Sequence, residues 1–283
     1  MKTSILLPLL LILSIASLAQ NNKIVILHTN DTHSQIEPTE KNAARNPEMG
    51  GYARRYELIT QIRNQEQHVV LIDAGDFSQG TPYYNFYGGR VEIKGYNLMK
   101  YDAVNLGNHE FDNGIDSLAM LLKMAEFPVV VSNYDVKESV IHGLIKPYHI
   151  ISKGDIKIGI FGLGVNPEGL IMERNYKGVK YLEPVSKAQE MAGILKNKKK
   201  CDVVICMSHL GSDSTEVKLN DFSLAKQTRN IDVIIGGHSH SMLENVKTLN
   251  MDGKPVIIAQ MAKSGLFLGR IDIGLSIKKK KLK

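Results

Sequence analysis

Residues 24–33 read IVILHTNDTH, an apolar, β-branched run that ends in an aspartate and a histidine. A run that is apolar at nearly every position is typical of a strand covered on both faces. Asp31 and His33 follow this predicted strand two residues apart, so their side chains can point the same way. A carboxylate beside an imidazole suits Mn²⁺, Zn²⁺, Fe or Co²⁺ better than Ca²⁺. One such pair is more often structural than metal-binding, so the interpretation depends on the rest of the chain.

Four further segments repeat this pattern, each closing an apolar run with side chains that bind metal ions or transfer protons. They are LIDAGD (71–76), VNLGNHEFD (104–112), ICMSHLG (205–211) and IIGGHSH (234–240). Together the five segments predict a site for two divalent cations that share one carboxylate. The candidate ligands are Asp31, His33, Asp76, Asn108, His209, His238 and His240.

The acidic residues of the second segment are expected to differ in role. Asp76 follows Gly75, which lets the backbone approach a ligand closely, so its carboxylate is the natural bridge between two cations. Asp73 is the competing candidate, and we interpret it as a structural acid. Four histidines do not lie in the loops that end these segments and are assigned to the core or the surface, with His28 near enough to the first loop to support it: His28, His68, His142 and His149.

The GNHE segment is the most specific of the five. Asn108 offers a neutral amide oxygen to a metal ion, which leaves His109 to face a substrate and donate a proton or a hydrogen bond to a leaving oxygen. Asp112 could orient that imidazole and raise its pKa. Glu110 is expected to start a helix or support the site, because a third carboxylate would overload the site with negative charge. Asn108 and His109 are therefore the predicted substrate-binding residues.

Short apolar runs alternate with helical stretches along the whole chain, which predicts an α/β fold with helices outside the sheets. The expected strands are 24–29, 69–73, 103–106, 129–132, 156–163, 203–207, 233–235, 256–260 and 267–273, and the expected helices are 51–64, 91–100, 115–125, 184–198 and 222–228. The candidate ligands all follow strands, and open α/β sheets place their sites at the carboxyl ends of strands. No internal repeat or linker divides the chain, so we expect a single domain.

The combination D-x-H, GD, GNHE, a later His and GHxH resembles the calcineurin-like metallophosphoesterase superfamily. Within it, HTNDTH, GDFSQGTP, GNHEFD and GGHSH resemble the catalytic domain of the bacterial periplasmic and secreted 5′-nucleotidases. The resemblance extends from residue 24 to about residue 275 and includes GGYARR (50–55) and SGLFLGRIDI (264–273). It implies a four-layer αββα metallophosphoesterase sandwich.

The resemblance also implies how the ligands divide between the two metals. One metal would take Asp31, His33, Asp76 and His240, where many relatives have Gln at the position of His240. The second would take Asp76, Asn108, His209 and His238, and His109 and Asp112 match the catalytic His–Asp pair of the family. The metals could be Mn, Zn, Co or Fe, because the nitrogen and oxygen ligands are compatible with each of them.

The expected activity is that of an exported dimetal phosphohydrolase, in which a hydroxide bridging the metals attacks phosphorus in line and His109 assists the leaving alkoxide. A 5′-nucleotidase-like specificity is the first hypothesis. A broad phosphomonoesterase or phosphodiesterase, acting on 2′,3′-cyclic nucleotides or UDP-sugars, is the second. A non-catalytic binding subunit is the third, and the complete ligand set argues against it. Full-length family members carry a second, nucleoside-binding domain that this chain does not resemble, so a separate chain could supply it.

The first residues indicate export to the periplasm or the medium. Met1 and Lys2 give a positive start, and residues 5–13 are apolar apart from Pro8. Ser17 and Ala19 are small residues at the expected cleavage positions, which predicts a signal peptide over 1–19 and no membrane anchor. The catalytic domain would then cover 20–276, followed by a basic tail at 277–283.

The net charge of +6 does not indicate a nucleic-acid polymer as partner, because Lys2 and the five lysines of the tail account for all of it. Cys201 and Cys206, five residues apart in CDVVIC, should face opposite sides of a strand and form no disulfide.

Overall fold

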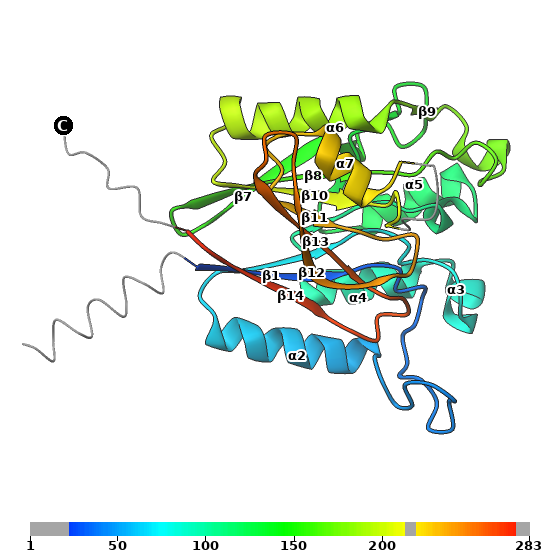
Figure 1. Ribbon diagram of the computed structural model, residues 1–283. Helices are drawn as coiled ribbons and strands as arrows, with labels where there is room; N and C mark the ends of the chain where they lie inside the picture. Colours follow the sequence, from blue (N-terminus) through cyan, green and yellow to red (C-terminus); the bar gives the residue numbers. More distant parts are fainter. Residues whose placement is uncertain (1–22, 213–218, 276–283) are drawn as a thin grey trace, which may run out of the picture.

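The computed structural model describes residues 23–212 and 219–275, which form two packed β-sheets with helices on both outer sides (Figure 1). The predicted signal peptide at 1–19 and the basic tail at 277–283 lie outside the described residues and stay predictions, as do the domain limits at 20 and 276. In the part that is described, no helix has both the length and the apolar character needed to cross a membrane.

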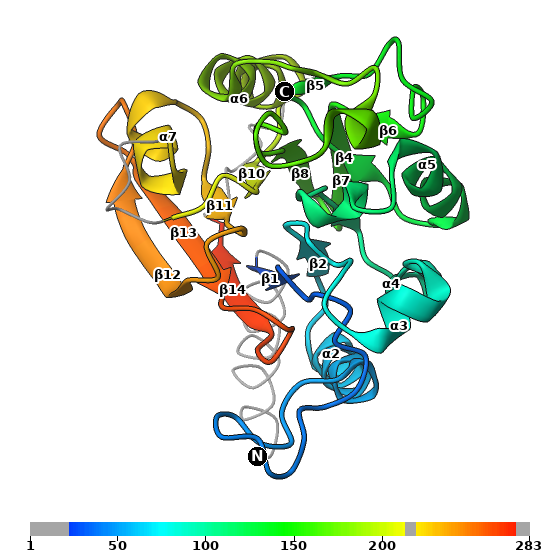
Figure 2. The ribbon, with the colours of Figure 1, turned by 90° about the vertical axis from the view of Figure 1, so that its right-hand side faces the viewer.

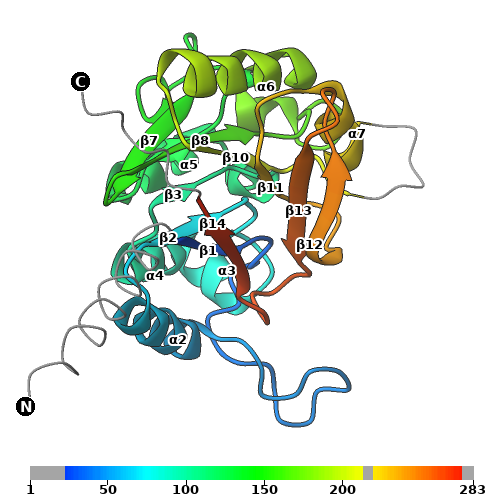
Figure 3. The ribbon, with the colours of Figure 1, turned by 60° about the vertical axis from the view of Figure 1, so that its left-hand side comes forward.

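The first sheet has six strands in the order β14-β1-β2-β3-β4-β6. Neighbouring strands from β1 to β6 run parallel, and β14 pairs antiparallel with β1 (Figure 3). Both faces of β1 are buried, because Val25 and Leu27 enter one hydrophobic cluster and Ile24 and Ile26 enter another. The strands are β1 (Lys23–Thr29), β2 (Val69–Asp73), β3 (Ala103–Val104), β4 (Val129–Val130), β6 (Ile145–Lys146) and β14 (Gly269–Gly274).

The second sheet also has six strands, in the order β12-β13-β11-β10-β8-β7, with parallel strands at its centre and an antiparallel strand at each edge. Its strands are β7 (Tyr148–Lys153), β8 (Ile156–Leu163), β10 (Val203–Ser208), β11 (Val233–Ile235), β12 (Met242–Leu249) and β13 (Pro255–Met261). A separate antiparallel pair joins β5 (Tyr134–Asp135) to β9 (Lys180–Tyr181).

Three hydrophobic clusters separate four layers of secondary structure. One cluster joins α2, α4 and α5 to the outer face of the first sheet, the second lies between the sheets, and the third joins α6 and α7 to the outer face of the second sheet (Figure 1). The α-helices are α2 (Tyr52–Gln65), α3 (Pro82–Tyr87), α4 (Arg90–Met99), α5 (Ile115–Met124), α6 (Pro184–Gly193) and α7 (Asp221–Gln227). Short turns of other helix types are η1 (His109–Phe111), η2 (Glu173–Tyr176) and η3 (Ile194–Lys198). The predicted αββα sandwich is therefore confirmed.

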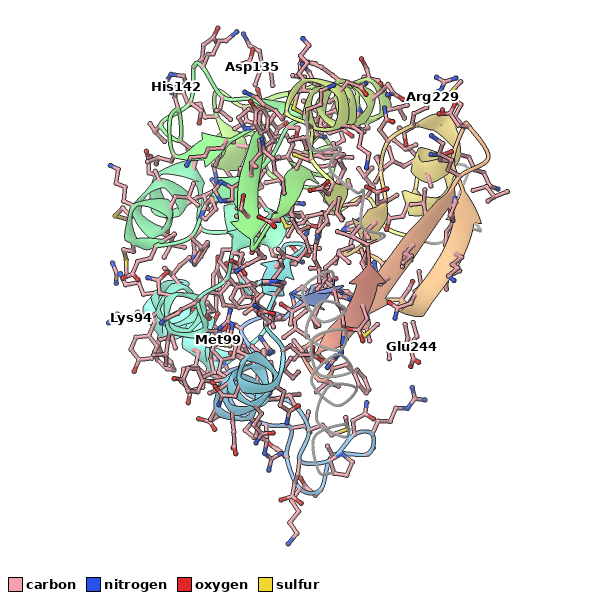
Figure 4. All side chains as sticks on the ribbon, turned by 90° about the vertical axis from the view of Figure 1, so that its left-hand side faces the viewer. Lys94, Met99, Asp135, His142, Arg229 and Glu244 are labelled. Carbon is pink, nitrogen blue, oxygen red and sulfur yellow. The ribbon has the colours of Figure 1, made fainter. Side chains whose placement is uncertain are left out.

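Several elements differ from the expectation. The predicted helix over 184–198 changes at Ile194 from α-helix to a π-helical turn. The strand β12 was not predicted because most of its side chains are exposed, and an edge strand of that kind lacks an apolar run (Figure 4 labels Glu244 on it). Five other elements were not predicted either: α3, β7, β5, β6 and β9. The strands β5, β6 and β9 have only two residues each, which is too short for a periodic pattern.

The two cysteines are free thiols, both buried, as the prediction without a disulfide requires. The reason given for it was wrong, however. Cys201 and Cys206 both contribute to the hydrophobic cluster on the outer face of the second sheet. Cys201 precedes β10, so the rule that successive side chains of a strand point to opposite faces does not apply to it.

His28 lies in β1 with no exposed surface, and neither ring nitrogen has a hydrogen-bond partner. The predicted core role is correct, and the suggested support of the first loop is not seen in its contacts. Burial lowers the pKa of His28 from 6.5 to about 3, so the folded protein keeps this imidazole neutral under conditions in which the unfolded chain protonates it. Its contribution to stability therefore falls as the pH drops from 6.5 towards 3.

We expect His28→Leu to flatten this acid dependence. In the wild type the His28 contribution to the free energy of unfolding should fall by about 1.4 kcal/mol per pH unit across this window. Urea unfolding between pH 7 and pH 4 measures it, and His142→Leu is the control because His142 lies at the surface (Figure 4). Equal pH dependence in the wild type and His28→Leu would contradict the expectation.

Candidate active site

The predicted site residues meet at the edge where the parallel strands of both sheets end. Asp31 follows β1, Asp76 follows β2, and His209 and His238 follow β10 and β11 of the other sheet. Figure 2 views the molecule from this edge. Residues from opposite halves of the sequence therefore share one location, as the rule for the carboxyl ends of strands predicts.

All seven candidate ligands belong to one connected group of side chains, which we call the ligand cluster (Asp31, His33, Asp76, Asn108, His209, His238 and His240). Potential ligand atoms of Asp31, His33 and His240 lie within 4.8 Å of one another, and so do those of Asp76, His209 and His238. A third group within that distance joins His33, Asp76 and His109. Asn108 completes the cluster, because its Oδ1 lies 3.1 Å from His238 Nδ1.

The geometry of the ring nitrogens fits metal binding. His33 Nε2 lies 2.9 Å from His240 Nε2, so two lone-pair donors converge. His209 is fully buried, and its Nδ1 donates to the carbonyl oxygen of Ala74 at 2.9 Å, which leaves Nε2 for a metal. That Nε2 approaches the Asp76 carboxylate at 3.0 Å yet has no aligned hydrogen-bond partner. A buried imidazole with an unsatisfied nitrogen beside a carboxylate is what a metal ligand requires.

The electrostatics of the ligand cluster also favour cations. Burial raises the pKa of Asp31 to about 7, although the nearby His209 and hydrogen bonds from Asn30 and His238 act in the opposite direction. Burial disfavours a charged imidazole at His209, but the Asp76 carboxylate beside it raises the pKa to about 10. Both shifts have the same meaning: without a cation, the buried negative charge of the ligand cluster is compensated by protons on Asp31 and His209. Divalent ions would supply that positive charge instead.

Five of the seven ligand-cluster residues have left-handed backbone, which is uncommon for residues other than glycine. The φ angles are 48° at Asp31, 44° at His33, 58° at Asp76, 70° at His238 and 54° at His240. Such conformations persist only where the surroundings determine them, and they concentrate at functional sites. Here the loops hold each other, because Asp31 N donates to Gly75 O at 2.9 Å and His33 N donates to Asp76 O at 3.0 Å.

Two acidic residues near the ligand cluster have supporting roles, as expected from sequence. Asp73 accepts hydrogen bonds from Thr29 Oγ1 and Tyr96 OH on the outer side of the first sheet. The Glu110 carboxylate is buried and accepts from three backbone N–H groups, at Asp76 (3.0 Å), Ser78 (3.0 Å) and Gly107 (2.6 Å). It therefore ties the Asp76 loop to the GNHE loop. A Cβ atom at Gly107 would overlap the Asp76 carboxylate and the His209 ring, so this approach requires glycine.

Two further supports of the ligand cluster were not predicted from the sequence. The Asn30 amide donates to Asp31 Oδ2 at 2.6 Å and to Ala262 O at 2.8 Å, and its Oδ1 accepts from Met261 N. The buried Gln260 of β13 donates to Gly237 O at 2.6 Å, while its Oε1 accepts from Ser239 Oγ and Ser241 N. Asn30 lies inside the HTNDTH segment and could have been suspected, whereas Gln260 lies in an ordinary apolar strand with no local signal.

The His109–Asp112 pair lies at the open side of the ligand cluster. His109 Nδ1 donates to Asp112 Oδ2 at 2.8 Å, and both side chains are about one-third exposed, at 31% and 36%. This hydrogen bond raises the pKa of His109. Because Nδ1 carries the proton for Asp112, Nε2 is the atom through which His109 can meet a substrate.

A dimetal-type ligand set at the strand ends of a four-layer sandwich defines the class of metal-dependent phosphoesterases. The sequence matches the family described as calcineurin-like phosphoesterase over residues 24–242, and the chain belongs to that family. The family uses divalent metals, and the three groups of candidate ligands are consistent with that chemistry.

Curated relatives and solved structures narrow the comparison to the catalytic domain of 5′-nucleotidases. A snake venom 5′-nucleotidase from Crotalus adamanteus is 34% identical over 272 residues, which are 89% of this chain and 45% of that protein. The crystal structure of a 5′-nucleotidase precursor from Thermus thermophilus superposes with a TM-score of 0.82 at 32% identity, covering 90% of this chain and 52% of the other.

The calcineurin-like phosphoesterase YfkN from Bacillus subtilis gives a TM-score of 0.73 at 29% identity and covers 91% of this chain and 86% of that one. This chain spans about half the length of the first two relatives, 45% and 52%.

Proposed function

We propose that this protein hydrolyses the phosphate esters of nucleotides with two divalent metal ions, in the manner of a 5′-nucleotidase. The observation that carries this proposal is the ligand cluster, to which both sheets contribute, beside a half-open His109–Asp112 pair. Membership in the phosphoesterase family supports the type of bond, and relatives named 5′-nucleotidases support the substrate class.

In this proposal one ion would be held by Asp31, His33, Asp76 and His240. The other would be held by four side chains, with Asp76 shared between the two sites: Asp76, Asn108, His209 and His238. Two such ions would supply a hydroxide nucleophile at neutral pH and would neutralise charge on the phosphate oxygens, which is the chemistry of in-line attack.

The protein's own groups position the substrate and handle the proton. Asn108 belongs to the ligand cluster and His109 lies next to it, so the phosphate would lie against these two residues. His109 Nε2 would donate to the oxygen of the leaving alcohol, while Asp112 fixes the ring through Nδ1. The carbonyl oxygen of Asp112 accepts from Asn175 Nδ2 at 3.0 Å, which steadies the turn that carries the pair.

The proposal also includes export to the periplasm or the medium. The composition of residues 1–19 supports export, and N-terminal sequencing of the mature protein would test cleavage near residue 19.

A separate chain with a nucleotide-binding domain could supply substrate specificity. Addition of such a partner should then increase activity towards AMP without changing activity towards a simple aryl phosphate.

The test is hydrolysis of AMP, UDP-glucose, 2′,3′-cyclic AMP and phenyl phosphate by the purified protein, with Mn²⁺ and with chelator. Chelator-sensitive release of phosphate from AMP is the expected result. Turnover of phenyl phosphate alone would leave the phosphoesterase chemistry intact and contradict the nucleotide specificity. No turnover of any ester by protein that retains bound metal would favour a binding subunit instead.

Gln260→Leu should weaken metal binding without touching a ligand. The change removes the three hydrogen bonds that hold the loop carrying His238 and His240, and lost supports of this kind typically reduce metal affinity about 10–100-fold. Mn²⁺ titration by calorimetry measures the affinity, and thermal unfolding of the chelated protein measures the separate cost to stability. Gln227→Leu on the exposed surface of α7 is the matched control. Unchanged Mn²⁺ affinity in Gln260→Leu would rule out this positioning role.

A further inference from the structure

A pocket of about 780 Å³ opens beside the ligand cluster, on the side of the second sheet. Its described walls are residues 165–170 after β8, residues 210–211 after β10 and residues 219–220 before α7, with His238 and Ser239 at the end nearest the ligand cluster. We call it the side pocket. Its volume lies in the range of about 300–1,000 Å³ that is usual for small-molecule sites.

The side pocket is continuous with the groups assigned to the phosphate. His238 lines it and also contacts Asn108, which precedes His109 in the chain. The wall at 165–170 continues into η2, where Asn175 donates to the carbonyl oxygen of Asp112. One segment of chain therefore runs from the side pocket to the His109–Asp112 pair. A phosphate placed against Asn108 and His109 has the side pocket next to it.

The lining combines apolar surface with hydrogen-bonding groups. Leu170 lines the pocket and is 47% exposed, so its apolar side chain is accessible to a ligand. The Tyr181 ring also lines the pocket and is held by the Tyr134 ring, with centroids 6.3 Å apart. Asn166 Oδ1 accepts from Glu168 N at 3.1 Å, and within residues 23–212 and 219–275 its Nδ2 has no acceptor. An apolar side chain and an aromatic ring beside a free amide group suit a heteroaromatic ring that carries polar edges.

We propose that the side pocket binds the alcohol part of the phosphate ester, a group of nucleoside size with a flat polar ring. This inference rests on the proposed phosphohydrolase function and adds a specificity site within the catalytic domain itself. The phosphate would lie at Asn108 and His109, the ring against Leu170 and Tyr181, and the polar edge of the ring near Asn166.

Leu170→Trp tests the proposal by filling the side pocket. The KM for AMP should rise about tenfold, while the inhibition constant of inorganic phosphate, which occupies only the phosphate position, should stay within twofold. Met172→Trp is the matched control, because Met172 is two residues away, 64% exposed and outside the pocket lining. The chain has no tryptophan, so the emission maximum of each variant reports its new indole, and a shift to shorter wavelength is expected only for Leu170→Trp.

Nucleoside binding without turnover separates this proposal from the proposed function. Saturation-transfer NMR should detect adenosine on the wild type and on the inactive Asp76→Asn variant, and not on Leu170→Trp. Equal KM values for AMP in the wild type and Leu170→Trp would overturn the side-pocket assignment and leave the phosphohydrolase function standing. If no ester is hydrolysed, the proposed function fails, yet adenosine binding that is lost in Leu170→Trp and kept in Met172→Trp would still support the pocket. Absence of adenosine binding from the wild type would overturn it.

Discussion

Asp76→Asn should abolish nearly all turnover and reduce the metal content of the protein. Asp76 is 2% exposed, contacts His209 at 3.0 Å and belongs to two of the three groups of candidate ligand atoms. The substitution removes the one carboxylate that both proposed ions would share. The transition state should lose several kcal/mol of stabilisation, which corresponds to roughly a 10³-fold loss of kcat/KM. Hydrolysis of phenyl phosphate measures turnover, and elemental analysis of the dialysed protein measures metal per chain.

Asp73→Asn is the matched control for this change. Asp73 ends β2 and Asp76 follows it by three residues. The Asp73 carboxylate accepts from Thr29 and Tyr96 through Oδ2 and from Gly75 N through Oδ1, and it belongs to none of the groups of candidate ligand atoms in the described residues. The control should lower the melting temperature, because a buried acceptor is weakened, and should keep the metal content of the wild type. Substantial activity in Asp76→Asn would show that the two-metal assignment is wrong, and loss of metal in Asp73→Asn would show that the two aspartates are not distinct.

The fold was predictable because its central strands are buried on both faces. β1, β2 and β10 have no exposed residue in their interiors, so each appears in the sequence as a nearly continuous apolar run. β12 gave no such signal, because the exposed residues of an edge strand need not be apolar. The candidate ligands could be identified for the same reason, because each of them follows an apolar run and therefore lies beyond the end of a predicted strand.

What sequence could not supply are contacts between segments far apart in the chain. Gln260 supports residues 237–241 from a neighbouring strand, and nothing in the local sequence PVIIAQM distinguishes that glutamine from any other. The left-handed backbone at His238 and His240 was equally hidden, because residues other than glycine rarely adopt it. The side pocket needs three loops to be placed together before it exists.

His109→Ala should spare metal binding and slow hydrolysis according to the leaving group. His109 has a ring nitrogen within 4.8 Å of ligand atoms of His33 and Asp76. The two proposed ligand sets are complete without it, however, and its ring is held by Asp112. Removal of a general acid typically costs about 10²–10⁴-fold in rate when the leaving group is a poor one, such as the ribose hydroxyl of AMP. An ester of 4-nitrophenol, whose leaving oxygen is stable without a proton, should lose much less.

The measurement is kcat for a series of aryl phosphates of increasing leaving-group pKa, in the wild type and in His109→Ala. A steeper dependence on leaving-group pKa in the variant is the expected result, with metal content unchanged. In Asp112→Asn the dependence of kcat on leaving-group pKa should be intermediate between those of the wild type and His109→Ala. The His109 ring remains in this variant, but its hydrogen bond to a carboxylate is lost. Parallel lines, with the same loss for every leaving group, would mean that His109 binds the phosphate and does not donate the proton. That outcome would keep His109 at the site and transfer the role of acid to another group or to solvent.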